Sequence, residues 1–518
     1  MNFSVLFGLL AQTDTAPATQ HATPAAPVVA ETVEQAVQAV EQAAQAAHAV
    51  QFGVVDFFVY LAYLIAAMLF VFGLKRLSSP RTARHGNIIA ALGMLIAIVV
   101  TLLDQHIVGF GTIIAGAIVG GAIGLIAARK VPMTGMPEMV ALFNGSGGAA
   151  SAVVALAEYW RGKPADLPGD TALTIGLSIL IGMVTLTGSV LAFAKLRGIS
   201  IKGVRLGNPL AFTGQHYANF LALGVVFILV IVLGFNPGAQ WAVLIVLVLA
   251  TLLGITLVSP IGGADMPVVV SLLNSYSGLA ACATGFVLNN AGLIISGALV
   301  GASGLILTNI MCKAMDRSLL NVLAGGFGQD IAAAGSTQAQ EGLTIRKMDA
   351  EEAAMVLEAA QSVAIVPGYG MAVAQAQHVV AEMAEFLREK GIDVKFAIHP
   401  VAGRMPGHMN VLLAEANVDY ELLHDLEINS EMPQIDVALI IGANDVVNPS
   451  ARDDPSSQIY GMPIFDVDKC KTVMVCKRSL NPGFAGIQNP LFFKENTTML
   501  FGDAKQMITE ILRALKEG

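Results

Sequence analysis

Nine apolar stretches between residues 54 and 312 set the strongest limit on how this chain can fold. Each is near the roughly 20 residues that an α-helix needs to cross the ~30 Å hydrocarbon core of a bilayer. We therefore predict a polytopic α-helical membrane domain with spans at about 54–74, 87–104, 107–128, 138–160, 172–195, 217–235, 240–258, 266–289 and 292–312.

The uneven distribution of charge divides the chain into parts. Only 13% of the residues are charged and the mean hydropathy is +0.67. Charges are sparse up to Met311 and ordinary after Arg346. This pattern is typical of a membrane block followed by a soluble domain. We predict a low-complexity tail at 1–53, a membrane domain at 54–312, a linker at 313–361 and a soluble domain at 362–518.

The overall charge and the cysteines exclude several classes of function. The formal net charge is −9 and no basic stripe is present, which argues against a nucleic-acid partner. The four cysteines have no metal-ligand spacing, so no metal site is expected.

Basic residues in the loops predict the orientation. They follow the first, third, fifth and ninth spans, whereas the intervening loops are nearly free of them apart from Arg161 and Lys163. By the positive-inside rule the N-terminus lies outside and the C-terminal domain is cytoplasmic. The cations in this pattern are Lys75, Arg76, Arg81, Arg84, Arg129, Lys130, Lys195, Arg197, Lys202, Arg205, Lys313 and Arg317.

Small and polar residues inside the spans indicate how the helices pack. Glycines repeat every four residues at 116, 120 and 124 and again at 297 and 301, which favours close helix contacts. Serines and threonines in the spans are best explained as interhelical hydrogen bonds. Asn144, Asn274 and Asp265 are at least as well explained by an ion path, because such groups are expensive at membrane depth.

A glycine-rich turn organises the soluble domain. The apolar run Val363–Val366 ends at Pro367, and glycines follow at 368 and 370 before a helical pattern from Met371 to Lys390. This approximates the dinucleotide-binding turn, although Val373 replaces the third glycine. A turn without a ligand is the alternative. The second strand, 393–398, ends at His399 where NAD-binding folds present an acid, which argues against NAD and leaves NADP open.

Further strands end in polar motifs. We predict strands at 436–441, 463–467 and 472–475 and a terminal strand–helix unit around 499–504. Such alternation predicts a Rossmann-like, doubly wound α/β domain with its ligand at the carboxyl ends of the strands. Lys477 and Arg478 suit a 2′-phosphate, with a solvated basic loop as the alternative, and Arg404 could clamp the pyrophosphate.

Several long motifs together resemble one family. They are Gly262-Gly-Ala-Asp-Met-Pro-Val-Val-Val270, Leu273-Asn-Ser-Tyr-Ser-Gly278, Pro367-Gly-Tyr-Gly-Met-Ala-Val-Ala-Gln-Ala-Gln377, Pro400-Val-Ala-Gly-Arg404, Gly442-Ala-Asn-Asp445, Lys477-Arg478 and Phe501-Gly-Asp-Ala504. From about residue 54 onward the chain resembles the β subunit of the proton-translocating NAD(P) transhydrogenase.

The resemblance implies a function and a set of partners. The C-terminal domain would bind NADP(H), the helices would carry protons, and a partner α subunit would bind NAD(H). Hydride would pass directly between the nicotinamides, coupled to inward proton movement across a bacterial cytoplasmic (inner) membrane. A dimer of heteromeric units is also implied. The alternative is a membrane transporter or channel that only senses NADP(H).

Motif and resemblance together predict the site residues. Asp445 is the expected proton-linked, catalytic acid near the nicotinamide. The nucleotide contacts are expected at Gly368, Tyr369, Gly370, Met371, Ala372, Val373, Val401, Ala402, Gly403, Arg404, Gly442, Ala443, Asn444, Asp445, Lys477, Arg478, Ser479, Gly502, Asp503 and Ala504. The proton path is expected at Asn144, Asp265, Asn274, Ser275, Ser303 and Gly304.

Two positions depart from the family pattern. Asn144 stands where some members have a histidine, and an amide cannot titrate. Phe484 stands where a tyrosine is common, so one hydroxyl contact to the cofactor is lost.

Overall fold

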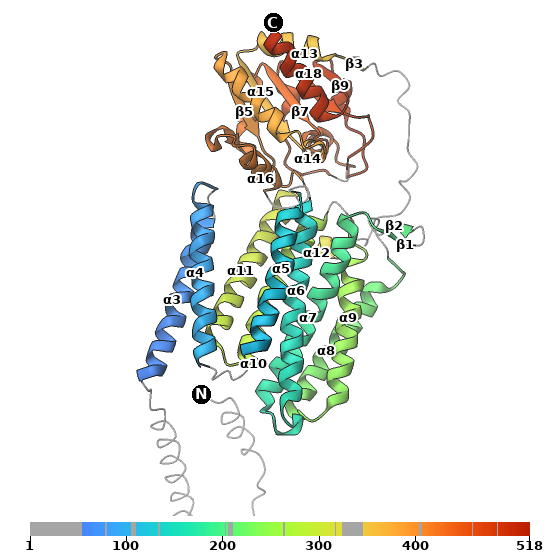
Figure 1. Ribbon diagram of the computed structural model, residues 1–518. Coiled ribbons are helices and arrows are strands. Elements are labelled where there is room, and N and C mark those ends of the chain that lie inside the picture. The colour runs from blue at the N-terminus through green and yellow to red at the C-terminus, as the bar shows by residue number, and fades with distance from the viewer. Residues whose placement is uncertain are drawn as a thin grey trace, which may run out of the picture. The chain divides into compact units, whose positions relative to one another are not determined.

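The computed structural model describes residues 54–77, 80–104, 110–132, 135–201, 204–205, 211–262, 265–315, 318–323, 345–403, 407–457, 459–483 and 485–517 (Figure 1). The predicted tail at 1–53 lies outside these ranges. Within them, nine helices are long and apolar enough to cross a membrane, which confirms the predicted number. They are α3 (Val54–Leu77), α4 (Pro80–Asp104), α5 (Phe110–Lys130), α6 (Met136–Arg161), α7 (Gly169–Leu196), α8 (Gln215–Phe235), α9 (Gln240–Val258), α10 (Met266–Val287) and α11 (Ala291–Ala314).

Local residues set several helix starts. Pro137 and Pro267 occupy the first turns of α6 and α10. N–H groups in a first turn have no partner within the helix, so the missing N–H of a proline costs no hydrogen bond there. At α11 the side-chain oxygen of Asn290 accepts a hydrogen bond from Leu293 N at 2.9 Å. That N-cap satisfies one of the free N–H groups at the helix end.

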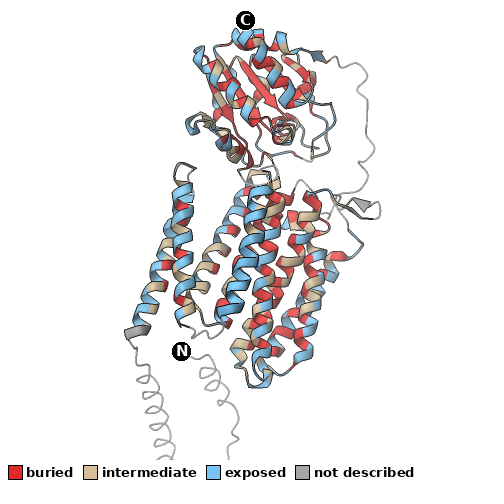
Figure 2. Cartoon of the chain, viewed as in Figure 1, coloured by how far each residue is buried: buried red, intermediate tan, exposed pale blue. Residues whose placement is uncertain are grey.

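The interior of the bundle lies among α6, α7 and α10, each of which carries a series of buried residues, and Figure 2 shows buried residues alternating with exposed ones along the bundle. Helices α10 and α11 approach closely at glycines: a Cβ added to Gly278 would lie 2.5 Å from Gly301 N. The predicted contact at Gly297 and Gly301 is therefore confirmed. The contact predicted for the glycines at 116, 120 and 124 is wrong for the described chain, because α5 buries none of its residues there and these glycines have no neighbour within 4 Å.

The C-terminal part is built on a seven-stranded sheet in which every neighbouring pair is parallel. Its strands are β3 (Arg346–Lys347), β4 (Ser362–Pro367), β5 (Asp393–Ala397), β6 (Leu423–His424), β7 (Val437–Ile441), β8 (Thr472–Lys477) and β9 (Thr497–Phe501). The order is β3-β9-β8-β7-β4-β5-β6. From β4 onward this is the doubly wound Rossmann order, with β3 added beside β9. The predicted fold class is confirmed.

Two apolar cores cover the two faces of the sheet. One face packs against helices, whose side chains include Leu357, Val380 and Ile508. These helices are α13 (Ala350–Glu358), α14 (Tyr369–Ala374), α15 (Gln377–Glu389), α16 (His408–Glu415) and α18 (Ala504–Glu517). The other face is covered mainly by short 3₁₀ turns that contribute Met432, Val467 and Phe492. Helix α13 lies within the stretch assigned to the linker, and the limits of the domains remain a prediction.

Some predicted elements are wrong in detail. The single helix expected over 371–390 is split, because Gln375 has a left-handed backbone (φ 50°) that ends α14 before α15 begins. The strand expected at 463–467 joins no sheet: Asn429 Nδ2 donates to Ile464 O at 2.7 Å, and Phe465 N donates to Val446 O at 2.9 Å. The two-residue strands β3 and β6 were not predicted, since so short a stretch carries no alternating pattern.

We expect the Gly368→Ala substitution to destabilise the soluble domain. A Cβ at this position would overlap the backbone of Gly442 and Ala443, and backbone cannot move aside as a flexible side chain can. The free energy of unfolding of the segment 345–518 should fall by about 1–3 kcal/mol, measured by urea denaturation. The matched control is Gly502→Ala, whose Cβ would meet only Met507 Cε at 3.4 Å. Equal stability of the two variants would contradict the prediction.

Candidate functional site

The loops after β4 and β7 meet at the carboxyl edge of the sheet. Gly368 N donates to Ile441 O and Gly370 N donates to Gly442 O, both at 2.9 Å. Gly442 has a left-handed backbone (φ 69°), and a Cβ on Gly370 would lie 2.6 Å from Gly442 Cα. The motif suggested that these glycines let a pyrophosphate approach the backbone. The structure shows that they also let two protein loops come into close contact. This is the position in the strand order where such folds bind ligands.

An amide, a carboxylate and an ammonium group form a chain beside these loops. The Asn444 side chain donates to Asp445 Oδ1 at 2.9 Å and accepts a hydrogen bond from Lys477 Nζ at 3.1 Å. Lys477 Nζ also donates to Asn481 O and lies 4.9 Å from the centre of the Phe492 ring. Burial lowers the pKa of Lys477, whereas the nearby Asp445 carboxylate opposes that shift. The ends of β7 and β8 are therefore joined by charge-assisted contacts.

The segment 479–489 packs against this chain of polar groups. Ala485 N donates to Asp445 Oδ2 at 3.0 Å, and Asn489 Nδ2 donates to Asn444 O at the same distance. A Cβ on Gly483 would meet Asp445 Oδ1 at 2.5 Å. Asp445 therefore bonds a segment 40 residues away instead of only shaping its own turn.

Sequence reasoning missed four of these residues. Asn481, Gly483, Ala485 and Asn489 belong to no ligand-binding pattern, and the one signal that could have marked their segment as a turn is Asn481-Pro-Gly483. Phe484, which the sequence singled out, lies outside the described residues, and so does Arg404.

The two adjacent cations have different surroundings. Lys477 is half-buried and bonded inside the protein, as described above. Arg478 is exposed and forms none of the hydrogen bonds or ion pairs found in the described part of the chain. Arg478 is thus the cation available to an anion from outside, while Lys477 is already engaged.

His399 lies just after β5, in the region where NAD-binding folds carry an acid. It is 2% exposed, and its Nε2 lies 2.8 Å from Pro463 O while its Nδ1 accepts a hydrogen bond from Val401 N. Because Nδ1 is an acceptor, Nε2 carries the proton and donates to Pro463 O. Burial lowers the pKa of His399 to about 4, so the ring is neutral at physiological pH.

The remaining predicted nucleotide residues surround the same edge. In α14 the side chains of Met371 and Ala372 are buried, whereas Val373 is exposed. Tyr369 lies 6.2 Å from His408 between ring centres, and His408 fills the space above Gly403. Of the other positions, Ala402, Ala443 and Ala504 are buried, and Val401, Ser479 and Gly502 are half-buried. The carboxylate of Asp503 accepts a hydrogen bond from Lys505 N.

In the membrane part, three of the predicted proton-path residues lie at contacts among α6, α10 and α11. Asn144 is buried and donates to Val270 O of α10 at 3.2 Å. Ser275 Oγ donates to Gly301 O of α11 at 2.6 Å, and a Cβ on Gly304 would lie 2.9 Å from Ser275 Cα. Asn274 is half-buried in the turn of α10 that follows Val270.

Asp265 and Ser303, the last of the six predicted proton-path residues, lie outside these contacts. Asp265 is buried directly before α10, at its N-cap position. Ser303 faces outward on α11 and donates to Val300 O of its own helix at 3.0 Å. Ser303 therefore makes the local bond expected of a helical serine, and the hydrogen bonds of the described residues include none between it and the other five.

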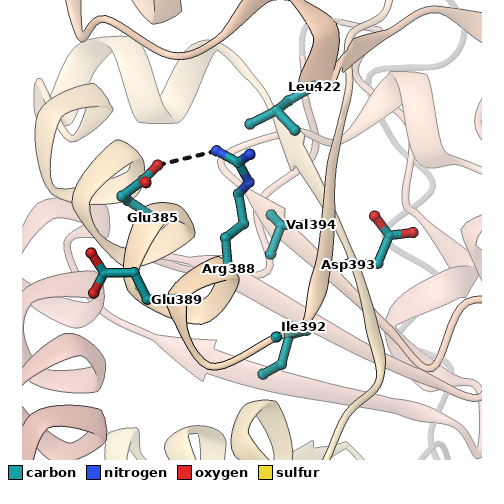
Figure 3. Close-up of a pocket in the computed structure, with 8 residues that line it drawn as sticks. Glu385, Arg388, Glu389, Ile392, Asp393, Val394 and Leu422 are labelled. Atoms are coloured by element: carbon teal, nitrogen blue, oxygen red, sulfur yellow. Dashed lines mark hydrogen bonds and ion pairs between the residues drawn. The ribbon is translucent and has the colours of Figure 1, made fainter.

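A shallow hollow of about 450 Å³ lies at the opposite edge of the sheet (Figure 3). Asp393, the first residue of β5, lines it together with Glu385, Arg388 and Glu389, and Glu385 pairs with Arg388 at 3.2 Å. This edge holds the amino ends of the strands, so it is not where a doubly wound sheet binds a nucleotide.

The groups at the carboxyl edge fit an anionic nucleotide. They offer an exposed guanidinium, a second cation at the adjacent residue, and a carboxylate held in a defined orientation by two hydrogen bonds. Bidentate guanidinium donors match phosphate oxygens in geometry and charge.

Comparison with known proteins gives one consistent result. The family model of the NAD(P) transhydrogenase beta subunit matches residues 59–514. The chain is 48% identical over 463 residues to the protein named NAD(P) transhydrogenase subunit beta from Rhodospirillum rubrum, covering 88% of this chain and 98% of that protein. The same-named subunit from a defined strain of that organism matches with the same identity and coverage.

We expect His399 to make the soluble domain sensitive to acid. The ring is neutral in the folded state and has an ordinary pKa near 6.5 when unfolded, so the unfolded state binds more protons below pH 6.5. Stability should fall by up to about 3 kcal/mol between pH 6.5 and 4. Unfolding of the segment 345–518 at several pH values should show a weaker slope in that window for His399→Gln. An unchanged slope would contradict the prediction, and His378→Gln, which changes an exposed histidine of α15, is the control.

Proposed function

We propose which step each part of the complex carries out. This chain belongs to the NAD(P) transhydrogenase β subunit family and is thus part of an oxidoreductase complex with an α subunit. The soluble domain binds NADP(H), the α subunit binds NAD(H), and hydride passes between them. The membrane helices couple that transfer to inward proton movement. The observation that carries the proposal is the junction of Asp445, Asn444 and Lys477 beside exposed Arg478, at the edge where this fold binds nucleotides.

The preference for NADP(H) rests on two features of the site. Arg478 is an exposed guanidinium with no bond to the described chain, as a 2′-phosphate requires. At the end of β5, neutral His399 donates to Pro463 O, so no carboxylate is offered there to a ribose 2′-hydroxyl. NADP(H) therefore gains Arg478 as a partner for its 2′-phosphate. NAD(H) has no phosphate for Arg478 and finds no carboxylate at this position for its ribose 2′-hydroxyl.

Asp445 is suited to link proton binding to the state of the site. A bound nicotinamide supplies hydride chemistry, and its ring changes charge in the process. The ionised carboxylate accepts hydrogen bonds from Asn444 and from Ala485 N and lies near the Lys477 ammonium. Protonation would weaken both acceptor bonds at once. The position of the segment 479–489 would then respond to the charge on one carboxylate.

The membrane part supplies polar groups for a hydrated path. Asn144, Asn274 and Ser275 lie on contacting helices, and buried Asp265 is the acid at the start of α10. Because Asn144 cannot titrate, we propose that a helix of the partner subunit contributes a titratable group. The protein would lie in the bacterial inner membrane with its soluble domain in the cytoplasm, in a dimer of heteromeric units within the bilayer. The loop cations support this orientation.

Co-purification and assay test the function. The complex isolated through this chain should contain a soluble NAD-binding partner and should transfer hydride from NADH to an NADP analogue. A chain that binds NADP(H), has no such partner and transfers no hydride would instead be the NADP(H)-sensing transporter.

We expect Arg478→Ala to weaken NADP binding selectively. Loss of a charge-assisted bond to phosphate should reduce the binding free energy by about 1.5–3 kcal/mol. Calorimetry of NADP and NAD on the segment 345–518 measures this, with Arg513→Ala on α18 as a distant cation control. Equal weakening for both nucleotides would reject Arg478 as the phosphate contact.

We expect Asp445→Asn to uncouple the reaction while leaving the fold intact. The amide keeps the size of the side chain but carries no negative charge and cannot take up a proton as a carboxylate can. In the assembled complex, the dependence of the hydride-transfer rate on pH should flatten, and the urea midpoint of the soluble domain should stay near that of wild type. Full proton-coupled activity across the pH range would refute the role of Asp445.

A further inference from the structure

Lys195, near the end of α7, is buried although the loop pattern placed it among solvent-facing cations. Lys195 is 4% exposed, and its Nζ donates to Ser259 O at 2.6 Å and to Ile261 O at 2.7 Å. The ion pairs found in the described ranges include none with Lys195. Two backbone carbonyls therefore hold this ammonium group, in place of a carboxylate.

Those carbonyls lie just beyond the end of α9, and two side chains of α8 bond to the same helix end. Gln215 Nε2 donates to Thr256 O at 2.6 Å and to Ser259 Oγ at 2.9 Å, and Asn219 Nδ2 lies 3.5 Å from Thr256 O. The last carbonyls of a helix have no partner within it and carry its negative dipole end. Unsatisfied carbonyls are especially costly away from water. Gln215 satisfies a carbonyl in the last turn of α9 with its amide, and Lys195 places a positive charge on two carbonyls just beyond that end.

The capped segment leads directly into α10. Ile261 N donates to Val258 O at 3.3 Å, and Asp265 N donates to Gly262 O at 3.2 Å. Asp265 then forms the N-cap position of α10, the helix that carries Asn274 and Ser275. The bonds of Lys195 thus hold Ser259 and Ile261, which come shortly before Asp265 and the start of α10 in the chain.

We propose that Lys195 is a positioning residue for proton movement, acting through the carbonyls of Ser259 and Ile261 on Asp265. This inference rests on the proposed function. Lys195 does not carry the proton: within the described residues, both of its hydrogen bonds go to backbone carbonyl oxygens, those of Ser259 and Ile261. Its removal would take one donor from each of those carbonyls and loosen the hold on Ser259 and Ile261.

A simpler role for Lys195 is to orient the chain by its charge alone. Arg197 is the matched control for that role, because it adds one positive charge at the same end of α7. It is exposed, and its guanidinium lies over the Phe193 ring, 5.7 Å from the centre. Lys195→Met and Arg197→Met remove the same charge two residues apart, and only the first removes the bonds to the α9 end.

The test uses the complete complex in proteoliposomes, with hydride transfer and proton uptake measured together. For Lys195→Met we expect kcat of the proton-coupled reaction to fall by about tenfold or more, because both charge-assisted bonds to the carbonyls are lost. KM for NADP(H) should stay within about twofold, because the nucleotide site lies in another part of the chain. Lys195→Arg should restore most of the rate, since the guanidinium keeps its N–H donors.

Each outcome decides between the roles. If Arg197→Met loses as much rate as Lys195→Met, charge alone matters and the positioning role is wrong. If Lys195→Met pumps at the wild-type rate, the role is wrong too. Should Lys195→Met yield no monodisperse complex, Gln215→Leu decides: a lower kcat at unchanged KM supports the role, and a wild-type kcat overturns it. A wild-type complex that moves no protons would overturn the proposed function itself.

Discussion

The soluble site depends on backbone contact between the loops after β4 and β7. Gly368 and Gly370 lie against Gly442 so closely that side chains would not fit, and two N–H groups of the first loop donate to the second. That contact sets where Asn444 and Asp445 leave the sheet. Lys477 and the segment 479–489 then bond to those two residues, so the polar network is built on a contact that only glycine allows.

The membrane part follows a related constraint, that backbone groups away from water need partners. Glycines at 278 and 297 let α10 and α11 come close, and hydroxyl groups such as that of Ser275 bond to carbonyls across the contact. Lys195 and Gln215 satisfy the α9 end in the same way. Polar side chains in this bundle mostly bond to backbone oxygens. Few groups are therefore available to bind protons, and Asp265 is the buried carboxylate within the described membrane part.

Much of the fold could be predicted from the sequence because its signals are strong. Span length and hydropathy predicted nine membrane helices, and apolar runs followed by glycine, by His399 or by Lys477-Arg478 predicted β4, β5, β7 and β8. The break at Gln375 was not predictable, because glutamine rarely adopts a left-handed backbone and no pattern marks it. The bonds of Asp445 to Ala485 and of Lys195 to the α9 end join residues far apart in the chain. Only tertiary structure reveals such pairs, and Lys195 looked like an ordinary loop cation.

The most direct test of the account is proton movement during hydride transfer. The chain and its co-purified partner would be reconstituted in proteoliposomes with a pH-sensitive dye, and NADH with an NADP analogue added outside. The account predicts a pH change in the lumen that needs both nucleotides and is abolished by a protonophore. Hydride transfer should then speed up, because the opposing gradient is gone. Hydride transfer at a rate that is unaffected by the protonophore, with no pH change, would contradict the coupling at the centre of this account.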